Sequence, residues 1–135
     1  MTHKITEIKG LEPAMATKLQ HEHIDTVDDL LKAVHTPAQR TALAKQLGVQ
    51  PTMLTEWINR ADLMRLKGVG TEMANLLEDC GVDSVKELQH RKPDTLAAKL
   101  KEVNDTKHIT HHAPTHTQVQ EWIDEARTLA TQSPI

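Results

Sequence analysis

A glycine-rich turn near the middle of the chain is the feature with the clearest capacity for chemistry. Val69 stands between Gly68 and Gly70, with an apolar helical pattern before this turn and another after it. Two glycines allow a tight turn that side chains would obstruct. Backbone N–H groups at the start of the following helix are then exposed, and the dipole of that helix adds partial positive charge. The sequence therefore predicts a phosphate-binding turn, formed by Arg65, Lys67, Gly68, Val69, Gly70 and Thr71. A purely structural turn, which only lets two helices pack closely, is the alternative.

Four histidines form a second candidate site. His108, His111, His112 and His116 lie in, or just after, a predicted loop over residues 105–115. Their spacing would let several imidazoles close on Zn²⁺ or Ni²⁺. The alternative is a polar loop whose imidazoles gain positive charge as the pH falls below about 6.5. Because the chain has nine histidines, protonation of all of them would change its net charge from −3 to +6 and favour anionic partners.

Both candidate sites need helices to position them, and the sequence predicts an all-α fold. The chain is divided into predicted helices by residues that mark helix ends. Prolines suit the first position of a helix, Ser and Thr suit the N-cap, and glycines suit the C-terminal end. The apolar spacing between them is helical. Ser84 with Glu87, and Thr115 with Gln118, form predicted capping boxes. The predicted helices cover residues 4–8, 13–22, 27–34, 37–47, 51–66, 71–80, 85–89, 93–103 and 116–130.

An internal repeat organises these helices. Residues 8–31 align without a gap with residues 66–89, and eight of the 24 positions are identical. Further along, Trp57 aligns with Trp122, and these are the only two tryptophans. Such a repeat indicates one supersecondary unit used twice. We therefore expect two units of about five short helices each, which share a long central helix and pack as one compact body. The expected units are residues 1–60 and 61–135.

The composition limits the classes of partner. Sixteen basic and 19 acidic residues are interspersed, so the chain lacks the strong positive footprint of many nucleic-acid binders. Phe and Tyr are absent, which leaves Trp57 and Trp122 as the large anchors of the core. Cys80 is the only cysteine, on the apolar side of a predicted helix. We expect it to be a buried, inert thiol.

The chain contains none of the motifs that identify common enzymes. It lacks a Walker loop and a nucleophile elbow, and Gly68 and Gly70 are not followed by the third glycine of a dinucleotide fingerprint. We expect a non-enzymatic protein with no cofactor and no small-molecule substrate. We find neither a signal peptide nor an apolar run long enough to cross a bilayer. These observations favour a cytoplasmic protein that does not enter a membrane.

The second half contains a set of landmark residues around and after the Gly68 turn. They are 61–70, Leu76, Leu77, 81–88, Leu96, Lys99, Leu100, 102–104, Pro114, Val119, Trp122, Ile123 and Ala126. Through these residues the second half resembles a bacterial helix-hairpin-helix family recorded only as a domain of unknown function, and the first half looks like a diverged copy. The resemblance implies an all-α fold of the helix-hairpin-helix and sterile-α-motif-like type, and no established activity.

Members of the wider helix-hairpin-helix superfamily often bind nucleic-acid backbone, but this chain departs from their pattern. Glu12 stands where the first hairpin would have its second glycine, and a carboxylate there could occupy the N-terminal donors itself. Glu72 follows the second hairpin, where lysine or arginine often occurs. In the predicted loop over residues 105–115, His111 and His112 stand where the family has a pair of basic residues. We therefore favour binding to a partner protein or self-association, with weak, sequence-independent nucleic-acid binding through Gly68-Val69-Gly70 as the alternative.

Overall fold

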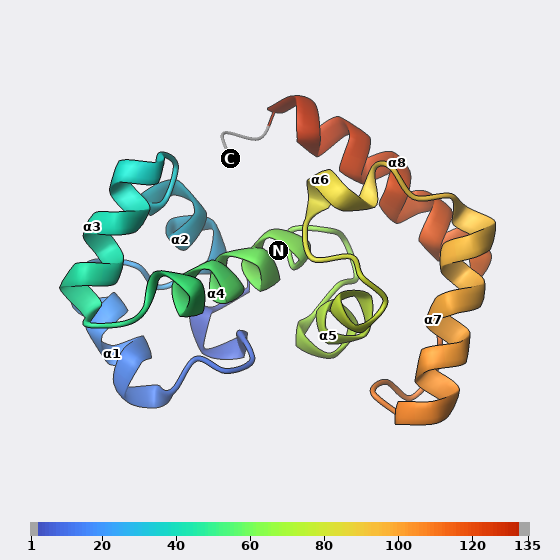
Figure 1. Cartoon of the computed structure of the whole chain (residues 1–135), viewed down its shortest axis with the longest axis horizontal. Coiled ribbons are helices and arrows are strands. Elements are labelled where there is room, and N and C mark those ends of the chain that lie inside the picture. The colour runs from blue at the N-terminus through green and yellow to red at the C-terminus, as the bar shows by residue number, and fades with distance from the viewer. Residues whose placement is uncertain (1–2, 133–135) are drawn as a thin grey trace. The chain divides into compact units, whose positions relative to one another are not determined.

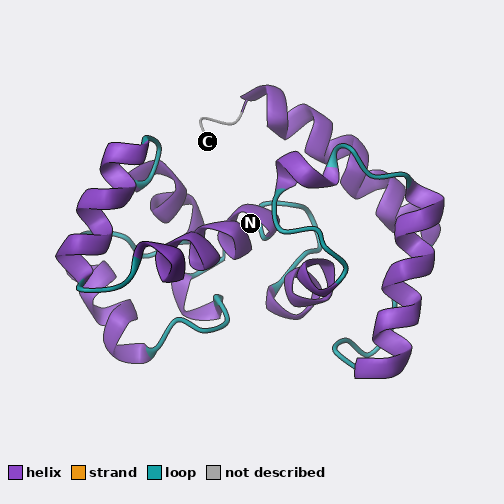
Figure 2. Cartoon of the chain, in the orientation of Figure 1, coloured by secondary structure: helices purple, strands orange, loops and turns teal. Residues whose placement is uncertain are grey.

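The computed structural model describes residues 3–132, with side chains up to Leu129, and this part of the chain is helical (Figures 1 and 2). It contains no strand, and Lys4 and Thr26 form an isolated β-bridge. The prediction of an all-α fold is thus confirmed. In order, the elements are η1 (Ile5–Glu7), α1 (Pro13–His21), α2 (Val27–Ala33), α3 (Pro37–Leu47), α4 (Pro51–Leu63), α5 (Thr71–Asp79), α6 (Val85–Leu88), α7 (Pro93–Lys107) and α8 (His116–Gln132).

The described residues divide into two compact units, with the division between Arg65 and Leu66. In unit 1, α4 packs against α2 and α3, while α1 contacts α3 and η1. In unit 2, α8 packs against α6 and α7, and α5 packs against α7. Helix α4 ends at Leu63, so it is shorter than the helix over residues 51–66 that the sequence predicts.

The residue types at the helix starts explain where the helices begin. Proline occupies the first turn of α1, α3, α4 and α7, where its missing N–H costs no hydrogen bond. The side chains of Thr26, Thr36 and Ser84 accept hydrogen bonds from backbone N–H groups in the first turns of α2, α3 and α6. The Thr115–Gln118 capping box is confirmed, because Thr115 N donates to Gln118 Oε1 at 2.9 Å and Gln118 N donates to Thr115 Oγ1 at 3.1 Å.

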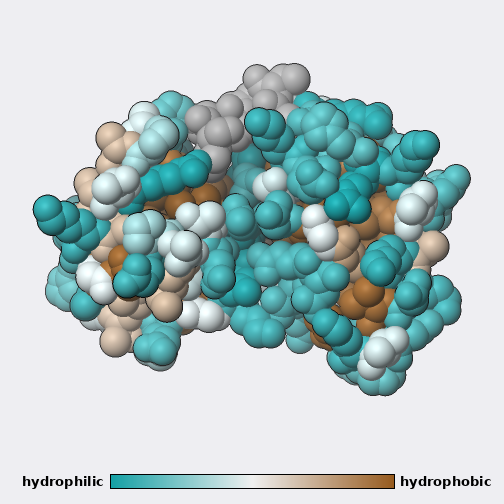
Figure 3. Space-filling model, in the orientation of Figure 1, coloured by the Kyte–Doolittle hydropathy of each residue, from teal (hydrophilic) through white to brown (hydrophobic). Residues whose placement is uncertain are grey.

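The core is built from aliphatic side chains and the two tryptophans. Trp57 in α4 is 3% exposed and Trp122 in α8 is 5% exposed. Among the described residues, Met53 is the one large hydrophobic side chain that is exposed. On the face drawn in Figure 3, the most hydrophobic surface of each unit lies in recesses between hydrophilic side chains. The surface on this face is therefore mainly polar.

Candidate functional site

The two glycines of the predicted phosphate-binding turn have different conformations. Gly68 has a φ of +83°, in the left-handed region that favours glycine. Gly70 has a φ of −99° and a ψ of −166°, which is extended backbone. A Cβ added to Gly70 would meet no atom within 4 Å. The expectation that the turn needs both glycines is therefore wrong, and only Gly68 is required by the backbone.

Helix α8 holds the turn at both backbone groups of Lys67. The indole Nε1 of Trp122 donates to Lys67 O at 2.9 Å. The backbone N–H of Lys67 donates to Glu125 Oε1 at 3.0 Å. Trp122 and Glu125 are one helical turn apart, so one face of α8 fixes the turn. A backbone donor of the candidate site is thus already bound to a carboxylate of the same chain.

The charged side chains near the turn are arranged unfavourably for an anion. The guanidinium of Arg65 forms an ion pair with the carboxylate of Asp62. The two side chains are only 15% and 10% exposed, so the positive charge of Arg65 is largely balanced below the surface. Lys67 is exposed, but Glu72 is exposed in the first turn of α5. Of the six predicted residues, Lys67 is thus the one that places a cationic side chain at the surface.

The corresponding turn in unit 1 lies at Gly10. It has a similar backbone geometry but is held by a different hydrogen-bond donor. Gly10 has a φ of +87°, and Arg60 Nη1 in α4 donates to Lys9 O. Glu12 takes the N-cap position of α1 and is exposed, but its side chain makes no capping hydrogen bond. The expectation that Glu12 occupies the N-terminal donors is therefore wrong.

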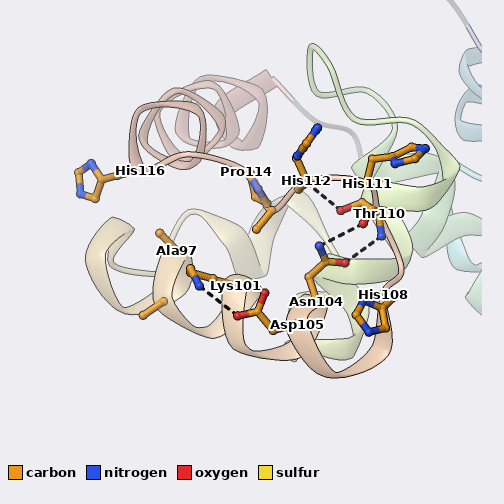
Figure 4. A pocket seen from close by; sticks show the side chains of 12 residues that line it. Ala97, Lys101, Asn104, Asp105, His108, Thr110, His111, His112, Pro114 and His116 are labelled. Atoms are coloured by element: carbon orange, nitrogen blue, oxygen red, sulfur yellow. Dashed lines mark hydrogen bonds and ion pairs between the residues drawn. The ribbon is translucent and has the colours of Figure 1, made fainter.

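An open pocket of about 620 Å³ lies beside the histidine-containing loop of unit 2 (Figure 4). The buried side chain of Asn104 shapes its wall, because Nδ2 donates to Thr110 O at 3.1 Å and Oδ1 accepts from Thr110 N at 2.8 Å. Lys101 Nζ and Asp105 Oδ2 form an ion pair at 3.0 Å on the helix α7 side. The lining residues are Ala97, Ala98, Lys101, Asn104, Asp105, His108, Thr110, His111, His112, Ala113, Pro114 and His116.

All four predicted metal ligands line this pocket, but they do not converge on one point. The ring centroids of His111 and His112 are 6.2 Å apart. His116 stands apart from the other labelled imidazoles in Figure 4, and its Nε2 pairs with Asp94. Within residues 3–132, no three His, Cys, Asp or Glu side chains are placed to share a metal ion. The predicted metal site is therefore not supported by the arrangement of His108, His111, His112 and His116.

Sequence reasoning missed three residues that determine these surfaces. Asn104 continues the apolar spacing of Leu96 and Leu100 along α7, and this spacing is a signal that it is buried. Trp122 was expected in the core, but nothing in the sequence indicates its hydrogen bond to the turn. Glu125 gives no local signal either, because its partner is 58 residues away.

The comparisons with known proteins identify the family of the chain. Residues 9–129 match the family model described as a domain of unknown function, DUF4332. Because the match covers both units almost completely, the chain belongs to this family, whose description assigns no activity. No curated protein and no solved structure matches the chain. None of the helices within residues 3–132 combines the length and apolarity that crossing a bilayer requires.

Proposed function

We propose that the chain is a pair of helix-hairpin-helix units that act as a non-enzymatic binding module for a protein partner or for a second copy of itself. The observation that carries the proposal is the double contact between Lys67 and α8. It makes the Gly68 turn part of the internal packing of unit 2. The turn then serves as a scaffold, and recognition is left to the surrounding surface.

Similar local geometry in the two units supports the helix-hairpin-helix assignment. Gly10 and Gly68 both have a left-handed conformation, and an extended N-cap residue follows each after one further residue. In both units the carbonyl just before the glycine accepts a hydrogen bond from the last helix. The donor is Arg60 in unit 1 and Trp122 in unit 2.

The charges at the second turn favour a protein partner over the backbone of a nucleic acid. The N–H of Lys67 is already bound by the carboxylate of Glu125, and a phosphate at the N–H groups that begin α5 would share that first turn with the exposed carboxylate of Glu72. Arg65 could assist only after leaving Asp62. Weak nucleic-acid binding through this turn thus remains the alternative proposal, with less support.

The histidine-containing pocket of unit 2 provides a surface suited to a protein. Its wall combines an ammonium group, a carboxylate, several imidazoles and a fixed backbone segment. Mixed charges and hydrogen-bonding groups are typical of the rim of protein interfaces, whereas nucleic-acid sites have one predominant sign. We propose this surface as the contact region.

A cytoplasmic location stays a prediction from the sequence.

One experiment compares the two proposals directly. Fluorescence anisotropy measures the binding of a labelled DNA duplex at low salt and at about 150 mM salt, at pH 7.5 and pH 5.5. Under our proposal the wild-type chain shows no salt-sensitive binding at pH 7.5. Salt-sensitive binding that Gly68→Glu abolishes would contradict the proposal and support the phosphate-binding turn. Binding confined to pH 5.5 would instead implicate protonated histidines.

A matched pair of variants tests whether the carboxylate of Glu125 keeps phosphate away from the turn. Glu125→Gln removes the charge that accepts the hydrogen bond from Lys67 N, while Asp124→Asn makes the same change at the exposed neighbouring residue. If the carboxylate excludes phosphate, DNA affinity rises in Glu125→Gln and stays unchanged in Asp124→Asn. An equal rise in both variants would show that local charge, rather than occupation of the turn, sets the affinity. An unchanged affinity in Glu125→Gln would contradict a role of this carboxylate.

A photo-crosslinking amino acid tests the protein contact itself. We would place it at Lys101 in the proposed contact region and, as a control, at the exposed Thr41 in unit 1. The proposal predicts a discrete protein adduct, or a covalent dimer, from position 101 alone. Sedimentation velocity over a range of concentrations separates self-association from a different partner. Equal or diffuse crosslinking at both positions would contradict the proposed contact region.

A further inference from the structure

A second, smaller pocket of about 350 Å³ lies in unit 2, away from the histidine-containing loop. Its apolar wall is formed by Cys80, the C-cap residue of α5, and by Leu96 in the first turns of α7. These side chains are 6% and 2% exposed. A volume of this size suits a small ligand. The remaining lining residues are His90, Arg91, Lys92, Thr95 and Lys99.

The rim of this pocket has the opposite charge from the protein as a whole. Arg91, Lys92 and Lys99 are cationic, and none of the described lining residues is a carboxylate, although the net charge of the chain is −3. Arg91 is partly balanced, because its Nη2 lies 2.9 Å from Glu87 Oε1. Lys92 and Lys99 are exposed, and no carboxylate of the described chain lies within ion-pair distance of either. The two lysines therefore place two positive charges without an ion-pair partner at the pocket.

The backbone adds to this positive charge. Lys92 is the N-cap of the 15-residue helix α7, and its side chain makes no capping hydrogen bond. Thr95 is the third residue of that helix, so its N–H belongs to the group that lacks acceptors within the helix. The partial positive charge of the helix N-terminus adds to that of the lysine side chains, while the exposed carboxylate of Asp94 in the same turn opposes both. Positive charge, backbone donors and an apolar wall thus line the same pocket.

The charges of this region also act on the Cys80 thiol. Burial raises the pKa of the thiol, the positive charges of Lys99 and Arg91 lower it, and the carboxylates of Asp79 and Glu102 raise it further. A neutral thiol is a poor nucleophile, so the pocket is better suited to binding than to thiol chemistry. As the only cysteine, Cys80 also offers a unique reporter for occupation of the pocket.

We propose that this pocket binds a small organic anion that carries a short aliphatic chain. The anionic head group lies between Lys92, Lys99 and the N-terminus of α7, and the chain lies against Cys80 and Leu96. The proposal does not depend on the protein partner proposed above, because it concerns other residues and a different class of ligand.

The experiment uses the rate at which iodoacetamide alkylates Cys80 in the full chain, measured by mass spectrometry at one fixed pH. Hexanoate serves as the probe, hexan-1-ol supplies the chain without the charge, and inorganic phosphate supplies charge without the chain. We expect hexanoate to slow alkylation with saturation, and the other two to have little effect. Chemical-shift changes at the amides of Thr95 and Lys99 would locate the ligand.

A matched pair of double variants tests the role of the rim. Lys92→Gln with Lys99→Gln removes the proposed contacts, while Lys45→Gln with Lys86→Gln removes two exposed charges outside this pocket. We expect the first variant to need about fivefold more hexanoate for half-protection, and the second to match the wild type. Equal protection by hexan-1-ol or by phosphate, unchanged protection in the first variant, or no protection at all would each overturn the proposal.

Discussion

The hydrogen bond between Trp122 and Lys67 allows a test within a single molecule. The substitution Trp122→Phe keeps an aromatic ring in the core but removes the indole donor to Lys67 O. In unit 1 the aligned substitution, Trp57→Phe, makes the same change to a similarly buried side chain. It leaves the hydrogen bond to Lys9 O intact, because Arg60 supplies that donor. The two variants therefore differ by one designed change, the loss of a hydrogen bond to a turn.

The expected difference follows from the energetics of hydrogen bonds. Both substitutions lose ring contacts in a packed core, and this cost is similar because Trp57 and Trp122 are almost equally buried. Trp122→Phe additionally loses a hydrogen bond of normal length, which contributes about 0.5–1.5 kcal/mol to stability. We therefore expect Trp122→Phe to lower the free energy of unfolding by about 1 kcal/mol more than Trp57→Phe does.

Urea unfolding followed by far-ultraviolet circular dichroism measures this difference. The slope of the free energy against urea concentration must be similar in both variants, so that a change in midpoint reports stability alone. Amide exchange provides a local check, because the N–H of Val69 should exchange faster in Trp122→Phe only. An equal or smaller loss of stability in Trp122→Phe would refute the view that this hydrogen bond stabilises the turn.

Three further predictions concern the backbone and the carboxylates. Gly68→Ala should cost about 1–2 kcal/mol because of its left-handed conformation, whereas Gly70→Ala should be almost neutral, and thermal unfolding of both variants tests this. His23 has a φ of 63°, so His23→Gly should raise stability by up to about 1 kcal/mol, and a lower melting temperature would contradict this. Hydrogen bonds from the backbone N–H groups of Lys4 and Asp25 lower the pKa values of Glu7 and Asp29 respectively. Lowered pKa values add stability above the unfolded-state pKa values, which is lost as the pH falls through the folded-state ones. Unfolding from pH 6 down to about pH 2 should therefore show a weaker acid dependence in a Glu7→Gln, Asp29→Asn double variant.

Helix starts could be predicted from the sequence, but some helix ends could not. Proline and hydroxyl caps are local signals, and α3 begins and ends where they predict. Helix α4 stops at Leu63, although buried Met64 and Leu66 continue the apolar pattern across its end. Helix α7 ends at Lys107. Its C-cap residue is His108, which has a φ of 52° in the left-handed conformation usually taken by glycine. In both helices the C-cap residue is neither glycine nor asparagine, the residue types that normally indicate a helix C-terminus.

The candidate sites were less predictable than the helices because they depend on contacts between distant residues. The sequence identified the Gly68 turn, but it could not indicate that Glu125 would bind Lys67 from α8. Similarly, the pocket at Cys80 brings together the end of α5 and the start of α7, which the sequence shows only as separate charged segments. Local patterns predict local structure, whereas the chemistry of a site depends on tertiary packing.

The contacts made by the last helix of each unit also have a consequence for biosynthesis. The hydrogen bond from Arg60 to Lys9 spans 51 residues, and that from Trp122 to Lys67 spans 55. During translation, unit 1 can make its closing contact once residue 60 has left the ribosome. Unit 2 must wait for α8, so its Gly68 turn emerges from the ribosome long before its partners. We therefore expect nascent chains that end before Trp122 to hold a folded unit 1 followed by an incomplete unit 2.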